Sequence, residues 1–262
     1  MFLMFKLPLN IVILILLMIS PEAGLQAQVK IIGHRGASFL APENTVSAAN
    51  LAWKNGADAV EVDIRLSADG KIVCSHDAST KRTSGIDLII SETNSKVLRK
   101  LDVGSFKDQK YKGEKLSFLK EIIKTVPAGK ELVIELKCGT EVLPELEWLI
   151  NKYEKRRNFV FISFDLPVIS ETKKTFPGYS SYWLCSNKDL LGKNIGNVPD
   201  SGLEGVSLSF NIIDEDIMKR ATSLGLEVYS WTVDDPAEAK RLITLGIKGI
   251  TTNRPGWLNS KL

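Results

Sequence analysis

Short apolar, β-branched runs alternate with amphipathic stretches along most of this 262-residue chain, and this alternation constrains the fold more than any other feature. The apolar runs predict strands at Lys30–Gly33, Ala59–Arg65, Ile72–His76, Glu131–Leu136, Phe159–Ser163, Tyr179–Leu184, Gly205–Leu208, Glu227–Trp231 and Gly249–Thr251. The amphipathic stretches predict helices at Asn44–Asn55, Ser117–Val126, Val142–Lys155, Leu166–Thr175, Asp214–Leu224 and Pro236–Leu245. Such alternation is typical of an α/β protein with a parallel sheet.

The length of the alternating region suits one domain, residues 28–262. A (β/α)8 barrel typically has about 250 residues. A doubly wound open sheet is the structural rival, but no GxGxxG or GxxxxGK[ST] fingerprint follows the first predicted strand. We therefore predict an α/β fold of the TIM-barrel type.

One predicted connection is too short for a regular barrel. Ser67–Gly70 alone joins the second and third predicted strands. A parallel pair needs a crossover of a dozen or more residues, so this pair must form an antiparallel hairpin. Nine predicted strands are also one more than the barrel requires, and we expect a barrel that is distorted at this hairpin.

The alternation stops between residues 77 and 115, where the chain is polar and ends in a lysine-rich run. A stretch of about 40 residues is too long for an ordinary loop. We therefore expect a small inserted subdomain after the third strand, over the mouth of the barrel. The lysines are expected to form a solvated face.

The first 27 residues have the pattern of an export signal. Lys6 supplies a positive charge, Ile11–Ile19 is an uninterrupted apolar run, and small residues precede Ala27. The apolar run is shorter than the roughly 20 residues that span a bilayer, which favours a cleaved signal peptide over an uncleaved anchor. We expect a periplasmic or secreted protein with no stable membrane span after cleavage.

Charge and cysteine content exclude several classes of protein. A net charge of +3, from 34 basic and 31 acidic side chains, is too small to indicate a nucleic-acid partner. Cys74, Cys138 and Cys185 lack CxxC spacing, so neither a zinc knuckle nor a disulfide framework is indicated. An odd number of cysteines leaves at least one thiol unpaired within a monomer.

The chain contains two histidines, His34 and His76, and both fall at the carboxyl end of a predicted strand. In (β/α)8 barrels the carboxyl ends of the strands form the catalytic face. One histidine alone is more often structural, but two at strand ends favour a catalytic site.

Two predicted strands carry acidic residues on one face and aliphatic residues on the other. Because strand side chains alternate, Glu61, Asp63 and Arg65 share a face, and so do Glu135 and Lys137. The aliphatic faces should pack on helices, which directs the carboxylates into the barrel. Glu61, Asp63 and Glu135 would then offer an all-oxygen site to Ca²⁺ or Mg²⁺. The alternative is that Arg65 and Lys137 neutralise these carboxylates as structural ion pairs.

These side chains together suit phosphate-ester chemistry. A divalent cation neutralises phosphoryl oxygens, Arg35 and Lys137 would stabilise charge that develops in the transition state, and two imidazoles exchange protons. Trp231, which shares a strand face with Tyr229, is a candidate wall of the substrate pocket, although aromatics at this spacing are more often core residues.

Seven motifs occur in an order that resembles the glycerophosphodiester phosphodiesterase family. They are His34-Arg35-Gly36, Pro42-Glu43-Asn44-Thr45, Glu61-x-Asp63, His76-Asp77, Glu135-Leu136-Lys137, Trp231-Thr232-Val233 and Gly249-Ile250-Thr251-Thr252-Asn253-Arg254-Pro255. The resemblance runs from Lys30 to Pro255. One departure is Asn253, which stands where an aspartate is common in the family.

The resemblance implies a distorted (β/α)8 barrel that hydrolyses glycerophosphodiesters to sn-glycerol 3-phosphate and an alcohol. It also implies that Glu61, Asp63 and Glu135 hold the cation and that His34 and His76 are the general acid and base, in an order that the sequence does not fix. Two alternatives stay open: a phospholipase D-like hydrolase of lysophospholipids on the same scaffold, and a non-catalytic barrel that binds a phosphorylated or sugar ligand. Neither the identity of the alcohol nor the oligomeric state follows from the sequence.

Overall fold

The computed structural model describes residues 29–153 and 157–262, so the predicted export signal lies outside the described residues. Within these ranges the strands are β1 Lys30–Gly33, β2 Ala59–Leu66, β3 Ile72–Cys74, β4 Glu131–Leu136, β5 Asn158–Ser163, β6 Ser180–Cys185, β7 Gly205–Ser209, β8 Glu227–Trp231 and β9 Gly249–Thr252. The α-helices are α1 Val46–Lys54, α2 Lys81–Ser84, α3 Ser95–Leu98, α4 Leu119–Thr125, α5 Leu143–Tyr153, α6 Leu166–Thr175, α7 Lys188–Asn194, α8 Glu215–Ser223, α9 Pro236–Thr244 and α10 Pro255–Asn259.

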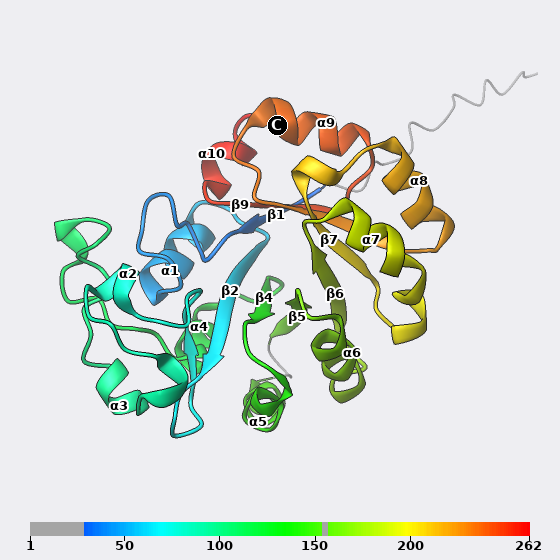
Figure 1. The fold of residues 1–262 in the computed structure, drawn as a ribbon. Helices are drawn as coiled ribbons and strands as arrows, with labels where there is room; N and C mark the ends of the chain where they lie inside the picture. Colours follow the sequence, from blue (N-terminus) through cyan, green and yellow to red (C-terminus); the bar gives the residue numbers. More distant parts are fainter. Residues whose placement is uncertain (1–28, 154–156) are drawn as a thin grey trace, which may run out of the picture.

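The parallel strands close into a barrel surrounded by helices (Figure 1). The strand order is β1-β9-β8-β7-β6-β5-β4-β2, and a further pairing between β1 and β2 closes the ring. The TIM-barrel prediction is therefore confirmed. β3 pairs only with β2 among the named strands of the described chain, and it runs antiparallel to β2, as the short connection requires.

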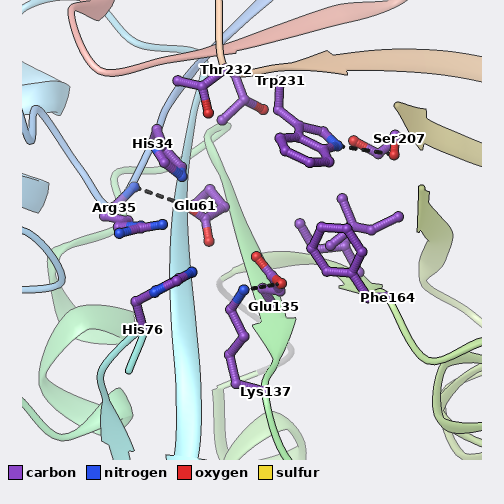
Figure 2. A pocket seen from close by; sticks show the side chains of 13 residues that line it. His34, Arg35, Glu61, His76, Glu135, Lys137, Phe164, Ser207, Trp231 and Thr232 are labelled. Carbon is purple, nitrogen blue, oxygen red and sulfur yellow. Dashed lines mark hydrogen bonds and ion pairs between the residues drawn. The ribbon is translucent and has the colours of Figure 1, made fainter. Parts of the chain in front are cut away.

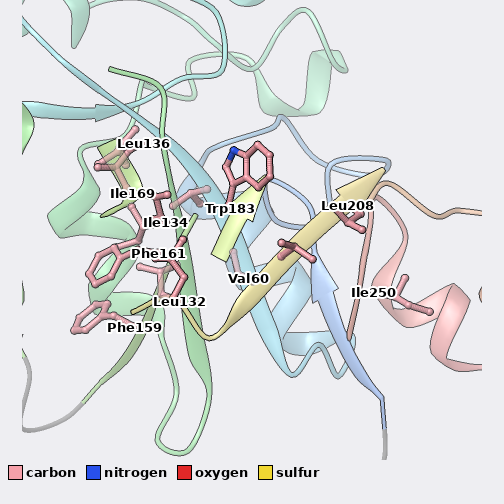
Figure 3. Close-up of a cluster of buried hydrophobic side chains, with 14 of the residues drawn as sticks. Val60, Leu132, Ile134, Leu136, Phe159, Phe161, Ile169, Trp183, Leu208 and Ile250 are labelled. Carbon is pink, nitrogen blue, oxygen red and sulfur yellow. The ribbon is translucent and has the colours of Figure 1, made fainter. Parts of the chain in front are cut away.

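The main hydrophobic core lies between the strands and the surrounding helices (Figure 3). Val60, Val62 and Ile64 alternate along β2 and are all buried in this core. A second, smaller cluster fills the inside of the barrel and includes Ile32, Ala59, Val133, Ile162, Tyr182 and Leu184. Because neighbouring residues of a strand point to opposite sides, the outward valines leave the side chains between them facing the barrel interior.

The six predicted helices all occur with similar bounds, although the predicted end at Lys155 lies outside the described residues; α2, α3, α7 and α10 were not predicted. α7 has its N-cap at Asn187, whose side chain accepts a hydrogen bond from the backbone N–H of Leu190. α10 begins with Pro255, which fits the first turn of a helix because its missing N–H would have no partner there. Both helices are too short to show an amphipathic period.

Residues 77–115 form a lobe beside α1 that contains the short helices α2 and α3 (Figure 1). A small apolar cluster joins the lobe to the segments that flank it, and its members are Val73, Ile90, Leu98, Leu101, Val103 and Leu116. Val73 belongs to β3, so this cluster packs the lobe onto the edge of the antiparallel hairpin. None of the described helices is both long and apolar enough to cross a membrane.

Candidate active site

Three acidic side chains meet inside the barrel because of the register between β2 and β4. Asp63 pairs directly with Glu135, and Glu61 lies two residues earlier on the same face as Asp63. All three residues are buried, with exposures of 2% for Glu61, 1% for Asp63 and 6% for Glu135. One carboxylate oxygen from each residue lies within 4.8 Å of one from each of the others. The structure thus brings together the three predicted metal ligands.

Two basic side chains neutralise part of this negative charge. The Arg35 Nε lies 3.2 Å from Asp63, and the Lys137 Nζ lies 3.4 Å from Asp63 and 2.5 Å from Glu135. Burial raises the pKa of Asp63, but the Arg35 and Lys137 charges outweigh burial and lower that pKa. Asp63 is therefore the carboxylate of the three that ionises most readily.

Glu61 and Glu135 resist ionisation. Burial and the neighbouring Asp63 charge raise the pKa of Glu61 well above its usual value, and the same two causes raise that of Glu135 to about 7. Within the described chain, Glu61 Oε1 has no hydrogen-bond partner. An unpaired buried acceptor beside two other carboxylates is costly unless a proton or a cation neutralises it. The cluster therefore fits a hard divalent cation with oxygen ligands.

His34 directly follows β1, and its backbone N–H donates to the carbonyl of Thr252 on β9 at 2.8 Å. This bond ties the start of the loop to the adjacent strand. The His34 ring lies with its Nδ1 atom 2.7 Å from the Oδ1 atom of Asn253. Burial, and after it the Arg35 charge, lowers the pKa of His34 from 6.5 to about 4. The His34 imidazole is therefore neutral near pH 7.

His76 reaches the site by a different route from the one predicted. β3 ends at Cys74, before His76, and it runs antiparallel to the barrel strands. His76 therefore does not lie at the carboxyl end of a barrel strand, and that part of the prediction is wrong. The hairpin instead folds the chain back along β2, and His76 then lines the same pocket as His34, Glu61 and Glu135 (Figure 2).

A chain of ion pairs joins His76 to Arg35. The His76 Nδ1 atom lies 2.8 Å from Asp77, and Asp77 accepts from Arg82 at 2.6 Å. Arg82 also donates to Glu43 at 2.7 and 2.8 Å, and Glu43 accepts from Arg35 at 2.9 Å. The hydrogen bond from Arg82 is the main cause that lowers the pKa of Asp77 to about 2. Asp77 is therefore ionised, and its contact with Nδ1 orients the His76 ring.

Arg65 does not neutralise the carboxylates, contrary to the alternative considered above. Its guanidinium donates to the backbone carbonyl of His76 at 2.8 and 3.1 Å and to that of Lys137 at 2.9 Å. Lys137 does pair with the carboxylates. Arg65 thus holds the backbone on both sides of the cluster in place.

Asn44 fixes the orientation of the central carboxylate. Its amide nitrogen donates to the Asp63 carboxylate at 2.8 Å, and its amide oxygen accepts from the Asp63 backbone N–H at 3.0 Å. Asn44 and Arg35 both have positive φ angles, of 59° and 53°, which are strained for residues with side chains. Strain of this kind is concentrated at functional sites, where the surrounding contacts maintain it.

The far wall of the pocket is apolar (Figure 2). Trp231 donates its indole N–H to the Ser207 carbonyl at 3.0 Å and packs edge-on against Phe164 at 5.4 Å. The Lys137 ammonium lies 5.3 Å from the centre of the Phe164 ring. The pocket therefore has a charged side, with both histidines and the carboxylates, and an apolar side that would suit the carbon skeleton of a small ligand.

The profile of the glycerophosphoryl diester phosphodiesterase family matches residues 34–257, a range that contains every residue described in this pocket. The chain belongs to this family. A glycerophosphodiester phosphodiesterase of Caldanaerobacter subterraneus subsp. tengcongensis is 30% identical over 243 residues, which cover 86% of this chain and 94% of that protein. A lysophospholipase D of Homo sapiens is 25% identical over 263 residues, which cover 86% of this chain and 83% of that protein.

Among solved structures, the chain is similar to a phosphodiesterase of Oleispira antarctica in complex with its product, sn-glycerol 3-phosphate. The two share 26% identity with a TM-score of 0.82, over 88% of this chain and 96% of the other. Family membership makes the chain a phosphoric diester hydrolase, and its buried acidic triad could hold a metal ion.

Several residues around the pocket escaped the sequence reasoning. The sequence pattern assigns no role to Glu43, Asn44 or Asp77, although all three belong to family motifs, and it does not mark Arg82 as a site residue. The available signal was the position of Asp77 directly after His76, because an adjacent carboxylate commonly orients a histidine. Arg82 has no such signal, because its contact with Glu43 joins residues 39 apart in the sequence.

Proposed function

We propose that this chain hydrolyses glycerophosphodiesters to sn-glycerol 3-phosphate and an alcohol, with Ca²⁺ or Mg²⁺ held by Glu61, Asp63 and Glu135. The observation that carries the proposal is that both histidines of the chain line one pocket together with Glu61 and Glu135, two members of the acidic triad. The cation would neutralise phosphoryl oxygens and so favour attack at phosphorus. The Arg35 and Lys137 side chains, which border the same pocket, would bind the remaining phosphoryl charge.

His34 acts as the base and His76 as the acid in the first step. The neutral His34 ring accepts the proton of the glycerol 2-hydroxyl while that oxygen bonds to phosphorus. The bond from phosphorus to the alcohol oxygen breaks, and His76 donates a proton to the leaving oxygen. Water then opens the cyclic phosphate with the two roles exchanged, which restores both rings and releases sn-glycerol 3-phosphate.

The test measures release of sn-glycerol 3-phosphate from glycerophosphocholine with a coupled dehydrogenase. His34→Ala and His76→Ala are each expected to reduce turnover by at least a hundredfold, since general acid–base catalysis typically contributes that much or more. Activity within tenfold of the parent protein would remove that histidine from the mechanism. Glu61→Gln should raise the cation concentration required for half-maximal activity, and an unchanged requirement would mean that the carboxylates are structural.

A second candidate is hydrolysis of lysophospholipids on the same site. Phe39 and Leu40, in the loop after β1, and Phe106, in the lobe, are 50%, 49% and 41% exposed. The loop and lobe are in contact, because Tyr111 donates to the Leu40 carbonyl at 3.0 Å. Exposed apolar side chains near a pocket favour a lipid substrate. A comparison of turnover with lysophosphatidylcholine and glycerophosphocholine separates the two candidates.

We also propose that residues 77–115 are an inserted subdomain of the barrel. A separate proposal is that residues 1–27 are an export signal and that the enzyme acts in the periplasm or outside the cell. The support for export is the sequence pattern of one charged residue, an apolar run and small residues before Ala27. Mass spectrometry of the protein expressed with its full N-terminus should give a chain that begins at Gln28. An intact N-terminus in the membrane fraction would instead indicate an anchor.

A further inference from the structure

The two histidines differ in what their Nδ1 atoms face. His76 faces the carboxylate of Asp77 at 2.8 Å, whereas His34 faces the side-chain amide of Asn253 at 2.7 Å. A carboxylate stabilises a protonated imidazole strongly, because the hydrogen bond joins two opposite charges. A neutral amide does so far less. The question for His34 is therefore which of its two nitrogens carries the single proton of the neutral ring.

The orientation of the Asn253 amide answers that question. Its Nδ2 atom lies 2.7 Å from the Asp234 carboxylate, which can only accept hydrogen bonds. The Ser38 hydroxyl donates to Asn253 Oδ1 at 2.9 Å. The Asp234 contact requires the amide nitrogen toward Asp234 and therefore the amide oxygen toward His34, and the Ser38 hydroxyl can donate to that oxygen. Because Asn253 Oδ1 can only accept, His34 Nδ1 must carry the proton and His34 Nε2 must be bare.

Asp234 is itself held firmly. Its Oδ1 atom accepts from the Thr252 hydroxyl at 2.7 Å and from the Asn253 backbone N–H at 2.9 Å. These donors belong to β9 and to the residue after it, and Thr252 also provides the carbonyl that binds the His34 backbone. The carboxylate, the amide and the imidazole are thus fixed to the same end of one strand.

We infer that Asp234 and Asn253 are positioning residues that hold His34 as the Nδ1–H tautomer and so present Nε2 as the proton acceptor of the reaction. This inference rests on the proposed function for the identity of the base, but the tautomer itself is a property of the free protein. The lowered pKa of His34, caused first by burial and then by Arg35, agrees with a ring that is neutral and bare at Nε2. A bare Nε2 on His34 would make His34 the base and His76 the acid, the order that the sequence left open.

The tautomer can be read directly, because the chain contains two histidines and therefore gives two imidazole signals. In the full chain labelled with ¹⁵N-histidine, long-range ¹H–¹⁵N spectra near pH 7 should show one ring with a protonated Nδ1 and a bare Nε2, and His34→Gln should remove that ring. Protonation of His34 at Nε2 instead of Nδ1 in the unmodified protein would overturn the inference, whatever any variant does.

Asp234→Asn tests the cause. Its amide cannot accept from both the Asn253 backbone and the Asn253 side chain in the present geometry, so the Asn253 amide should flip and His34 should shift toward the Nε2–H tautomer. We expect kcat to fall at least tenfold while KM changes less than threefold. An unchanged tautomer in a folded Asp234→Asn protein would contradict the inference.

Asp235→Asn is the matched control, because it makes the same chemical change one residue along the chain. Asp235 caps α9 through the Ala237 backbone N–H at 3.0 Å and makes no contact with His34 or Asn253 in the described structure. It should leave tautomer and kcat within twofold of the parent protein. If the tautomer is as inferred but His34→Ala retains full activity, the proposed function fails and the inference about the tautomer stands.

Discussion

Glu135→Gln should stabilise the cation-free protein while it weakens the proposed cation site. Burial and the Asp63 charge raise the pKa of Glu135 from 4.5 to about 7 in the folded state, even though the Lys137 ammonium lies 2.5 Å from its carboxylate. That rise corresponds to a cost of about 3 kcal/mol for the ionised carboxylate in the folded chain. Glutamine has nearly the same shape and no charge, so it avoids this cost.

The raised pKa of Glu135 determines how the difference in stability between the variant and the parent protein changes with pH. The folded-state pKa of Glu135 lies above the unfolded value, so the stability linked to its proton is complete below pH 4.5 and is lost as the pH rises through about 7. With chelator present, Glu135→Gln should therefore gain on the parent protein as the pH rises. At about pH 8 the gain should approach about 3 kcal/mol, or roughly 6–12 °C in Tm for a chain of this size.

The assay is urea unfolding with chelator and with an excess of divalent cation, at about pH 5 and about pH 8. Saturating cation should reverse the order at about pH 8, because ligand binding stabilises the parent protein by about 4 kcal/mol at a thousandfold excess over Kd. Glu131→Gln, on the same strand with a partly exposed partner in Lys30, is the control and should change stability by less than about 1 kcal/mol. A Glu135→Gln protein that is less stable than its parent in chelator at both pH values would refute the reasoning.

Three further predictions concern the surroundings of the site. Gly36→Ala should lower the free energy of unfolding in urea by at least about 2 kcal/mol, because φ is +82° and the added Cβ would lie 2.5 Å from a backbone carbon of α1. Gly70→Ala is the control: φ is +71° there but the space around it is open, so the loss should be about 1 kcal/mol. Equal losses for the two variants would contradict the steric argument. Arg82→Ala should lower kcat roughly tenfold, because it releases the carboxylates that contact His76 and Arg35. Lys81→Ala should leave kcat unchanged, because the Lys81 ammonium pairs with an exposed carboxylate. Equal activity of the two variants would argue against the ion-pair chain. Burial raises the pKa of the Cys138 thiol to about 11. Ellman's reagent at about pH 8 should therefore react with this thiol slowly in the native protein and quickly in urea. Rapid labelling in the native protein would contradict the prediction, because it would show that the thiol is accessible.

The features of the site that the sequence predicts are those that depend on strand alternation. Glu61, Asp63 and Glu135 could be placed inside the barrel because their neighbours along each strand are aliphatic, and a strand repeats every two residues. Arg65 shares that alternation but ends up on backbone carbonyls, because it lies at the end of β2 where the hairpin turns back. Periodicity gives the face of a side chain but not its partner.

The contacts that could not be predicted link segments far apart in sequence. The Arg82 side chain meets Glu43 across 39 residues, and His34 meets Asn253 across 219. Such contacts depend on the closure of the barrel and on the docking of the lobe, neither of which leaves a local pattern. The direction of β3 could be predicted, because four residues are too few for a parallel return, but the route of the chain to His76 could not.

The pairing of Asp63 opposite Glu135 makes the alignment of β2 and β4 a requirement for ion binding as well as for packing. A shift of one residue along either strand would turn a carboxylate toward the helices and a valine or leucine toward the ion. Only the correctly aligned pair of strands presents the complete set of oxygens, so the proposed cation would bind that alignment selectively. Divalent cation present during refolding should therefore enrich the native alignment over slipped ones. The proposed ion would in this way favour correct assembly of the barrel that holds it.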